Sequence, residues 1–165
     1  MKLKRSISNI PLCFFLMVGL SWEVGAYDEI QLSKLKQLGN CVACDLSGAN
    51  LERENLWEAN LTGANLERAN LWKAYLKGAD LSEANLTGAN LWKAYLKGAD
   101  LWKANLKGAD LIWANLERAN LSEANLTGAN LSEANLQGAN LQGAVLDGAR
   151  DCGTQFDWGE ENSGC

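Results

Sequence analysis

Four of the five cysteines of this 165-residue chain, all but Cys13 near the N-terminus, are the residues whose type and spacing best suit metal or redox chemistry. Cys41 and Cys44 form a C-x-x-C pair, and Cys152 and Cys165 lie near the other end of the sequence. Such a pair suits a redox dithiol, a zinc site or a structural disulfide. The chain has no histidine, the commonest general base and metal ligand, so a structural role is favoured. Four cysteines allow three disulfide connectivities.

Residues 1–26 predict a secretory signal peptide. The basic start MKLKR precedes the apolar run IPLCFFLMVGL, and the segment ends in VGA, so we expect cleavage after Ala26. An uncleaved N-terminal anchor is the alternative, although the apolar run is short for a bilayer. Without this segment the chain has 12 basic and 19 acidic side chains and a net charge of −7. We therefore expect an exported acidic domain that does not bind nucleic acid, with its four remaining cysteines in disulfides.

A strict five-residue period runs from residue 44 to residue 148. Leucine occupies all 21 positions from Leu46 to Leu146, and alanine stands two residues before it except at Cys44 and Glu54. The residue between them is Asn or Asp in 18 of the 21 repeats. A period of five forms no stripe on a helix, and it would alternate faces on a straight strand. We therefore expect short extended A-x-L pieces, with alanine and leucine inward and a corner after every leucine.

Longer identities along the chain suggest how many repeats close one coil. The stretch LWKAYLKGADL occurs at residues 71–81 and again at 91–101, a spacing of 20. If each corner turns by about a right angle, four pentapeptides close a square coil of 20 residues, and the next coil stacks about 4.8 Å away. Glycine is the second residue after leucine in ten of the 21 repeats, where a turn can require a positive φ.

On these motifs, the chain resembles the pentapeptide repeat proteins, and more narrowly their exported cyanobacterial members, in which a short helix and a segment like CVACDLSGANL at 41–51 precede the repeats. The resemblance implies an all-β fold, a right-handed quadrilateral β-helix of about five coils with leucine and alanine inside. It implies no catalytic activity and no cofactor. The expected segments are a signal peptide (1–26), an N-terminal capping helix with a cysteine staple (27–43), the β-helix (44–148) and a C-terminal cap or tail (149–165).

The two ends of the solenoid need caps, since exposed strand edges invite aggregation. For the helix we expect Asp28 as N-cap with Gln31 in a capping box, an apolar face of Leu32, Leu35 and Leu38, and Gly39 as the stop.

Five coils place the two ends of the solenoid roughly 25 Å apart, and a disulfide requires Cα atoms within about 7 Å, so we expect Cys41–Cys44 and Cys152–Cys165 bridges. At the C-terminal end we expect Phe156 and Trp158 to cover the last leucines.

Function must then reside on the outer surface. Stacking by 20 residues gathers aromatic and basic side chains around one corner of the acidic rod, as the aromatic–cationic patch: Trp72, Trp92, Tyr75, Tyr95, Lys73, Lys93, Lys77 and Lys97. Stacked lysines should repel one another unless a partner or salt screens them. The alternative is that the patch only reflects duplication of a 20-residue unit, with rings that stack for stability.

Three functional classes follow from these features. An enzyme is disfavoured, because acids are spread along a convex rod and Glu54 is the one inward carboxyl candidate. A DNA-mimicking topoisomerase inhibitor occurs among cytosolic members of the family, but the predicted signal peptide argues against it. We favour a non-enzymatic structural or protein-interaction module of the periplasm or thylakoid lumen, a monomer or end-to-end dimer, with a glycan or anionic surface as an alternative ligand.

Overall fold

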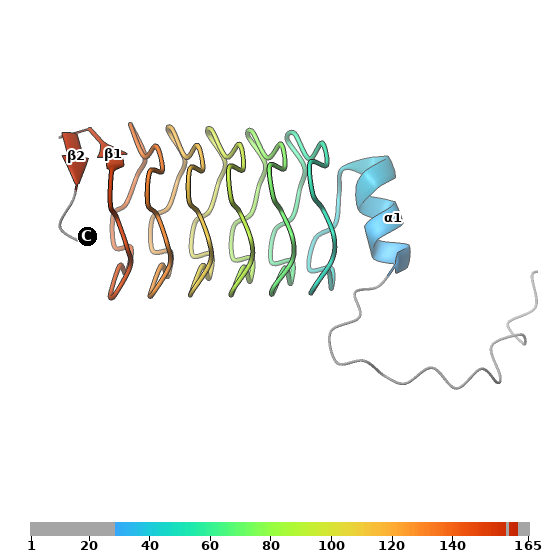
Figure 1. The fold of residues 1–165 in the computed structure, drawn as a ribbon. Coiled ribbons are helices and arrows are strands. Elements are labelled where there is room, and N and C mark those ends of the chain that lie inside the picture. Colours follow the sequence, from blue (N-terminus) through green and yellow to red (C-terminus); the bar gives the residue numbers. More distant parts are fainter. Residues whose placement is uncertain (1–28, 158, 162–165) are drawn as a thin grey trace, which may run out of the picture.

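The computed structural model describes residues 29–157 and 159–161, which form a straight rod of stacked coils (Figure 1). Helix α1 (Glu29–Leu38) lies across one end of the rod. Strands β1 (Thr154–Phe156) and β2 (Gly159–Glu161) lie at the other end. The predicted signal peptide, with Asp28, Trp158 and Cys165, lies outside the described residues, and the roles predicted for these residues remain predictions. No helix in the described part of the chain is long and apolar enough to cross a bilayer.

The coils stack at a spacing of 20 residues. Parallel bridges join each residue at the middle of an A-x-L piece to the residue 20 positions later, from Asn40–Asn60 to Asn135–Gln155. Because each coil holds four pentapeptides, it has four sides, and the predicted quadrilateral β-helix is confirmed. The pairing continues beyond the predicted repeat range of 44–148 at both ends, so the column from Asn55 to Gln155 has six members.

Leucine and alanine fill the inside of the coil, as predicted. Nineteen of the 21 repeat leucines are buried, most of them completely. The prediction is wrong for Leu146, which is 39% exposed, and Leu141 is only partly buried. Each inner leucine is covered by the residue 20 positions later, and Leu146 has no such neighbour among the described residues. Burial of one leucine contributes roughly 1.5–3 kcal/mol before chain entropy is subtracted.

Hydrogen bonds explain why Asn and Asp stand between alanine and leucine. In residues 86–90, four of the five backbone N–H groups donate to carbonyl oxygens of neighbouring coils or of the same turn. The fifth, that of Thr87, donates to Oδ1 of Asn85 at 3.2 Å, an Asx turn at the start of the corner. The Asn85 amide also donates to Asn65 one coil below, at 3.1 Å. The Asn or Asp side chain therefore supplies the acceptor that the backbone lacks at this corner.

Every corner places its second residue in the left-handed region, whether or not that residue is glycine. Gly98 has a φ of 66°, and Lys93 and Lys103 both have a φ of 54°. The turn is closed by a hydrogen bond from the alanine N–H to the preceding leucine carbonyl, as from Ala94 to Leu91 at 2.9 Å. A positive φ costs a non-glycine residue about 1–2 kcal/mol, which the stacked coils offset.

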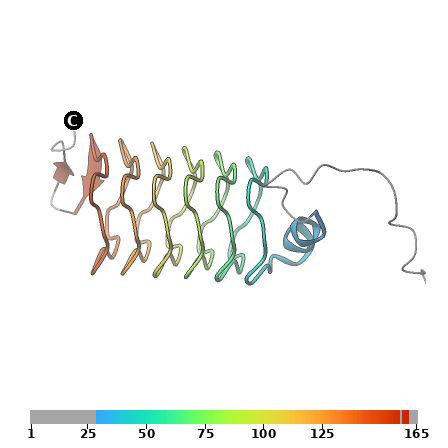
Figure 2. The ribbon, with the colours of Figure 1, turned by 90° about the horizontal axis from the view of Figure 1, so that it is seen from below.

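Helix α1 covers the first coil and is seen nearly end-on in Figure 2. Leu35 is buried and Leu32 partly buried against the core, while Oε1 of Gln31 accepts a hydrogen bond from the Asp45 N–H at 2.6 Å. The prediction that Leu38 shares this face is wrong, because its side chain is 70% exposed. Leu38 is six residues after Leu32, a rotation that carries it about 120° away around the helix.

The two N-terminal cysteines belong to the repeat itself. Cys41 is five residues before Leu46 and occupies the leucine position, while Cys44 occupies the next alanine position. Both are buried, and a disulfide joins them across a single corner. The bond thereby closes the turn at which the chain leaves α1 and enters the first coil. At the other end Cys152 is also disulfide-bonded, while its predicted partner lies outside the described residues.

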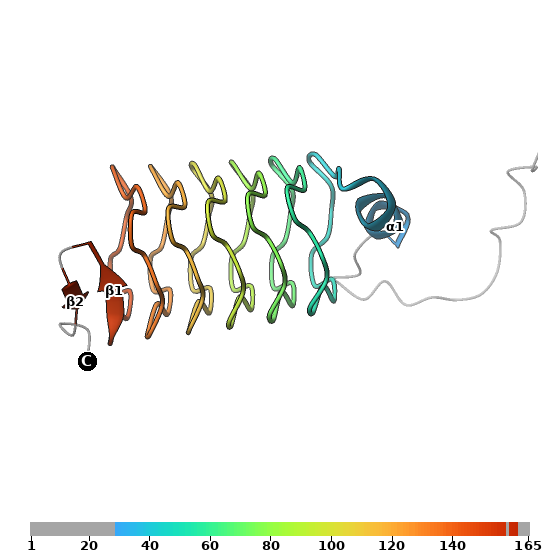
Figure 3. The same cartoon turned by 90° about the horizontal axis from the view of Figure 1, so that it is seen from above.

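Strand β1 continues the repeat with different residues. Thr154 and Phe156 lie 20 positions after Ala134 and Leu136, and both are buried. The Leu136 N–H donates to the Gln155 carbonyl at 2.8 Å, which places β1 in register as a further A-x-L piece. Strand β2 then pairs antiparallel with β1 and lies beyond it at the end of the rod (Figure 3). Phe156 therefore covers its side of the core, as predicted.

Candidate interaction surface

The structure divides the aromatic–cationic patch into two neighbouring clusters. Trp72, Trp92, Lys73 and Lys93 lie at one corner of the rod, which we call the tryptophan corner. Tyr75, Tyr95, Lys77 and Lys97 line a separate depression of about 550 Å³ on the adjoining side, which we call the tyrosine groove. Its other lining residues are Arg53, Asn55, Trp57 and Asn115.

At the tryptophan corner, cations and indole rings alternate along the rod. The rings of Trp72 and Trp92 stack with centroids 5.7 Å apart. The Lys73 ammonium lies 4.3 Å from the Trp72 ring centroid, and the Lys93 ammonium lies 4.2 Å from that of Trp92. The guanidinium of Arg53 also lies over the Trp72 ring, 4.6 Å from its centroid. Each cation therefore has an aromatic partner, a contact that the sequence did not predict and that adds to the stability of the column.

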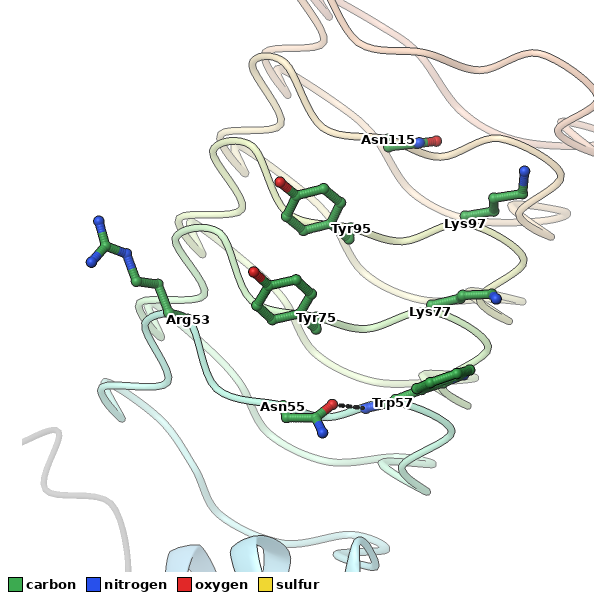
Figure 4. A pocket seen from close by; sticks show the side chains of 8 residues that line it. All are labelled: Arg53, Asn55, Trp57, Tyr75, Lys77, Tyr95, Lys97 and Asn115. Atoms are coloured by element: carbon green, nitrogen blue, oxygen red, sulfur yellow. Dashed lines mark hydrogen bonds between the residues drawn. The ribbon is translucent and has the colours of Figure 1, made fainter.

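In the tyrosine groove, two parallel rings form the floor (Figure 4). The rings of Tyr75 and Tyr95 have centroids 5.0 Å apart and planes 3° apart, and the side chains are 48% and 45% exposed. Both rings lean toward the corner that carries Arg53, and Lys77 and Lys97 extend on the opposite side (Figure 4). The groove thus has an aromatic side and a basic side.

The tyrosines also change the hydrogen bonding of the backbone. At all the remaining repeats from 60 to 140, the Asn or Asp side chain accepts a hydrogen bond from the N–H group two residues later. Asn115 accepts such a bond from the Glu117 N–H at 3.0 Å. Tyrosine has no oxygen that can reach this N–H group. Within the described residues, the N–H groups of Lys77 and Lys97 accordingly have no acceptor. Sequence reasoning missed these two donors, although the replacement of Asn by Tyr was the signal for them.

The charges of the groove are only partly balanced. The Lys97 ammonium donates to Oε2 of Glu117 at 2.7 Å, and this hydrogen bond holds the pKa of the Glu117 carboxyl below its ordinary value. Lys77 lies 4.9 Å from the ring centroid of Trp57 and has no carboxylate partner among the described residues. Lys73 and Lys93 likewise form no ion pair within that part of the chain. Three of the four patch lysines are therefore available to an acidic ligand.

Glu54, the candidate inward carboxylate, has a structural partner. It occupies an alanine position of the first coil, where α1 lies below, and its carboxylate binds the Lys36 ammonium. Within the described residues, no group of three or more His, Cys, Asp or Glu side chains is placed to hold a metal ion. Glu54 therefore links α1 to the first coil through an ion pair, and it is not among the residues that line the tyrosine groove.

The strict repeat and the four-sided coil identify the family. The sequence profile described as pentapeptide repeats matches residues 40–74, 64–102, 74–111 and 114–150, with eight copies. The chain belongs to the pentapeptide repeat family. As in the pentapeptide repeat proteins of known structure, its quadrilateral β-helix is right-handed.

Three solved pentapeptide repeat proteins are similar to this chain. HetL of the cyanobacterium Nostoc, involved in heterocyst differentiation regulation, is 38% identical with a TM-score of 0.50 over 73% of this chain and 63% of HetL. A thylakoid lumen protein of Arabidopsis thaliana is 34% identical with a TM-score of 0.50 over 58% of this chain and 63% of that protein. Rfr23 of the cyanobacterium Cyanothece is 38% identical with a TM-score of 0.38 over 73% of this chain and 92% of Rfr23.

The match to the first two relatives is partial, because the alignment spans 63% of the length of each. Pentapeptide repeat proteins are generally non-enzymatic structural or interaction proteins. A comparison with curated proteins gave no match. Family membership therefore establishes the architecture, and the groove and the tryptophan corner carry the argument on function.

Proposed function

We propose that this pentapeptide repeat protein is a non-enzymatic interaction module that docks a protein partner on its aromatic–cationic patch. The observation that carries the proposal is a set of three patch lysines that have no carboxylate partner among the described residues, in a chain whose net charge is −5. Exposed aromatic and cationic side chains are enriched where proteins bind partners. Stacking alone accounts for the paired rings, but it supplies no counter-charge for Lys73, Lys77 and Lys93.

We further propose that the module acts after export to the periplasm or the thylakoid lumen. The basic and apolar segments before residue 27 support export, and so does the similarity to a plant protein of the thylakoid lumen. Sequencing the N-terminus of the mature protein tests this directly. We expect the first residue to be Tyr27, and an intact Met1 would instead support an anchored protein.

The docking proposal is tested by comparing partners captured from periplasmic or lumenal extract. The test variant carries Lys73→Gln, Lys77→Gln, Lys93→Gln and Lys97→Gln, and it should fold because all four side chains lie on the outer surface. A matched control carries the same change of charge at exposed sites away from the patch: Lys34→Gln, Arg68→Gln, Lys107→Gln and Arg150→Gln.

We expect the patch variant to lose a partner that the wild type and the control both retain. The loss should be largest at low salt, because screened charge attraction weakens as ionic strength rises. Equal capture by the patch variant and the wild type at both salt concentrations would overturn the proposal and leave the patch as a consequence of duplication.

A further inference from the structure

We infer that the tyrosine groove is a carboxylate-binding site for an acidic peptide segment, in which the backbone N–H groups of Lys77 and Lys97 are the donors. The inference rests on the proposed docking function and names the chemistry of the partner. It follows from three observations: the two donors without acceptors, the surrounding charge, and the orientation of the tyrosine rings.

The donors occupy equivalent positions on successive coils. Lys77 and Lys97 each follow a tyrosine by two residues, so their N–H groups lie one coil apart, about 4.8 Å. In a regular repeat an Asn or Asp oxygen accepts the bond at this place, as Asp80 does for Ser82 at 3.0 Å. An oxygen from a ligand would occupy the position of that missing acceptor. The two oxygens of one carboxylate are suited to bridging two such donors.

The groove leaves room for a ligand in front of these donors. Figure 4 shows that the rings of Tyr75 and Tyr95 lean away from the lysine side of the groove. The depression of about 550 Å³ is lined by the rings, by the two lysines and by Arg53, with Asn55 and Asn115 at its ends (Figure 4). A side chain from an extended segment could therefore enter beside the rings without displacing them.

The surrounding charge favours an ionised acceptor over a neutral one. The Lys77 ammonium belongs to the groove and has no carboxylate partner in the described part of the chain. The Lys97 ammonium is shared with Glu117, and Arg53 lies across the groove. Hydrogen bonds between backbone N–H groups and a carboxylate are shorter and stronger than those to a neutral oxygen. An acidic side chain thus fits the groove better than its amide counterpart.

The stacking of the rings limits a sugar to the outer faces of each pair. A sugar ring typically packs on the open face of an aromatic ring, but Tyr75 and Tyr95 stack on each other 5.0 Å apart, so each covers one face of the other. Trp72 and Trp92 cover each other in the same way. The tyrosine pair keeps its ring edges and its two outer faces for a ligand, and the apolar parts of a peptide can lie against them.

The central experiment restores the missing acceptors and leaves every cation in place. In the variant Tyr75→Asn/Tyr95→Asn, the new side chains should bond the N–H groups of Lys77 and Lys97 as the other Asn residues of the repeat do. A Tyr75→Ala/Tyr95→Ala variant removes the rings without supplying an acceptor. A Tyr75→Phe/Tyr95→Phe variant keeps the rings. Circular dichroism confirms that each variant is folded before binding is measured.

The probe is a fluorescein-labelled hexapeptide of alternating glutamate and serine, titrated by fluorescence anisotropy at low and moderate salt. The wild type should bind it about tenfold or more tightly than the matched glutamine–serine peptide. The Asn variant should lose about tenfold or more in affinity, the Ala variant less, and the Phe variant little. In nuclear magnetic resonance spectra, the peptide should shift the amide signals of Lys77 and Lys97 and leave that of Ser82 unchanged.

Several results would overturn the inference. One is equal binding of the glutamate peptide by the Asn variant and the wild type, which would mean that the N–H groups take no part. Another is no binding of the peptide by the wild type. A third is tighter binding of polygalacturonate or of phosphatidylglycerol vesicles than of the peptide, which would assign the groove to a glycan or to a lipid surface.

Failure here is distinguishable from failure of the docking function. If the four-glutamine variant loses its protein partner while the Asn variant keeps it, docking stands and the carboxylate site is wrong. If the glutamate peptide binds as described but the four-glutamine variant captures the same partners as the wild type, the carboxylate site stands and the docking function falls.

Discussion

The ring of Tyr95 lies 5.0 Å from that of Tyr75, its counterpart one coil earlier, with 3° between the two planes. The pair interrupts a column that carries Asn at positions 55, 115 and 135. Two effects follow from one substitution. The rings add a stacked apolar pair to the surface, and the corner after each ring loses its side-chain acceptor. The tyrosine groove is therefore a local break in the row of side-chain acceptors that Asn and Asp supply at the other repeats from 60 to 140.

Amide hydrogen exchange should detect this break. We expect the N–H groups of Lys77 and Lys97 to exchange about ten times or more faster than those of Ser82 and Glu117, which donate to Asx side chains. Exchange resolved by residue in nuclear magnetic resonance spectra measures the difference. Comparable protection at all four sites would mean that another group accepts these bonds.

A core leucine and its neighbour should differ sharply in their contribution to stability. Leu96 is fully buried, so Leu96→Ala should lower the free energy of unfolding by about 2–5 kcal/mol. Lys97→Ala, one residue later on the surface, should cost only a small fraction of that. Urea denaturation of both variants measures the two losses, and equal values would show that the inward and outward faces have been misassigned.

The ion pair between Lys97 and Glu117 should be visible in the titration of the carboxyl. The hydrogen bond from Lys97 lowers the pKa of Glu117 below its reference value of 4.5, so the folded protein keeps this carboxylate ionised to lower pH than the unfolded chain does. The pair therefore stabilises the fold above about pH 4.5, and that contribution disappears as the pH falls through the lowered pKa.

Carbon-detected titration of the Glu117 side chain measures this directly. In Lys97→Gln its pKa should rise toward the reference value, because the charged donor is gone. Lys107→Gln, which removes an exposed lysine that forms no ion pair among the described residues, serves as the control and should leave the pKa of Glu117 unchanged. No change in Lys97→Gln would show that the pair is not formed in solution.

Loss of the N-terminal disulfide should loosen one end of the rod only. A loop as short as that between Cys41 and Cys44 gives an entropic stabilisation of about 2 kcal/mol, so the double alanine variant should lose about that amount. Exchange should increase at residues 41–50 and stay slow in the central coils, because each coil contacts only its neighbours. Uniform acceleration along the rod would contradict this independence.

Peptide mapping of the oxidised protein gives a companion measurement. We expect Cys152 to pair with Cys165, and any bridge from Cys41 or Cys44 to either C-terminal cysteine would be incompatible with a rod of this length.

Much of the architecture could be predicted because each contact in the coil repeats a local rule. Leucine at every fifth position sets the inward face, and identical segments 20 residues apart set the stacking. The same spacing predicts that Tyr95 stacks on Tyr75 and that Trp92 stacks on Trp72, as the structure shows. The same spacing assigns Cys41 to a leucine position, five residues before Leu46. It also assigns Phe156 to a leucine position, 20 residues after Leu136.

The sequence by itself determined the coil, its inward face and the columns on its surface, because these depend only on the period. The tertiary structure decided the side-chain rotamers, the packing at the two ends and the acceptor of each hydrogen bond, none of which follows from the period. Rotamers placed Lys73 over an indole ring and Lys97 on Glu117. Non-repeating packing at the ends left Leu38 and Leu146 exposed. The free N–H groups of the tyrosine groove likewise became visible only when the acceptor of every corner could be traced, because a hydrogen bond depends on the positions of both of its partners.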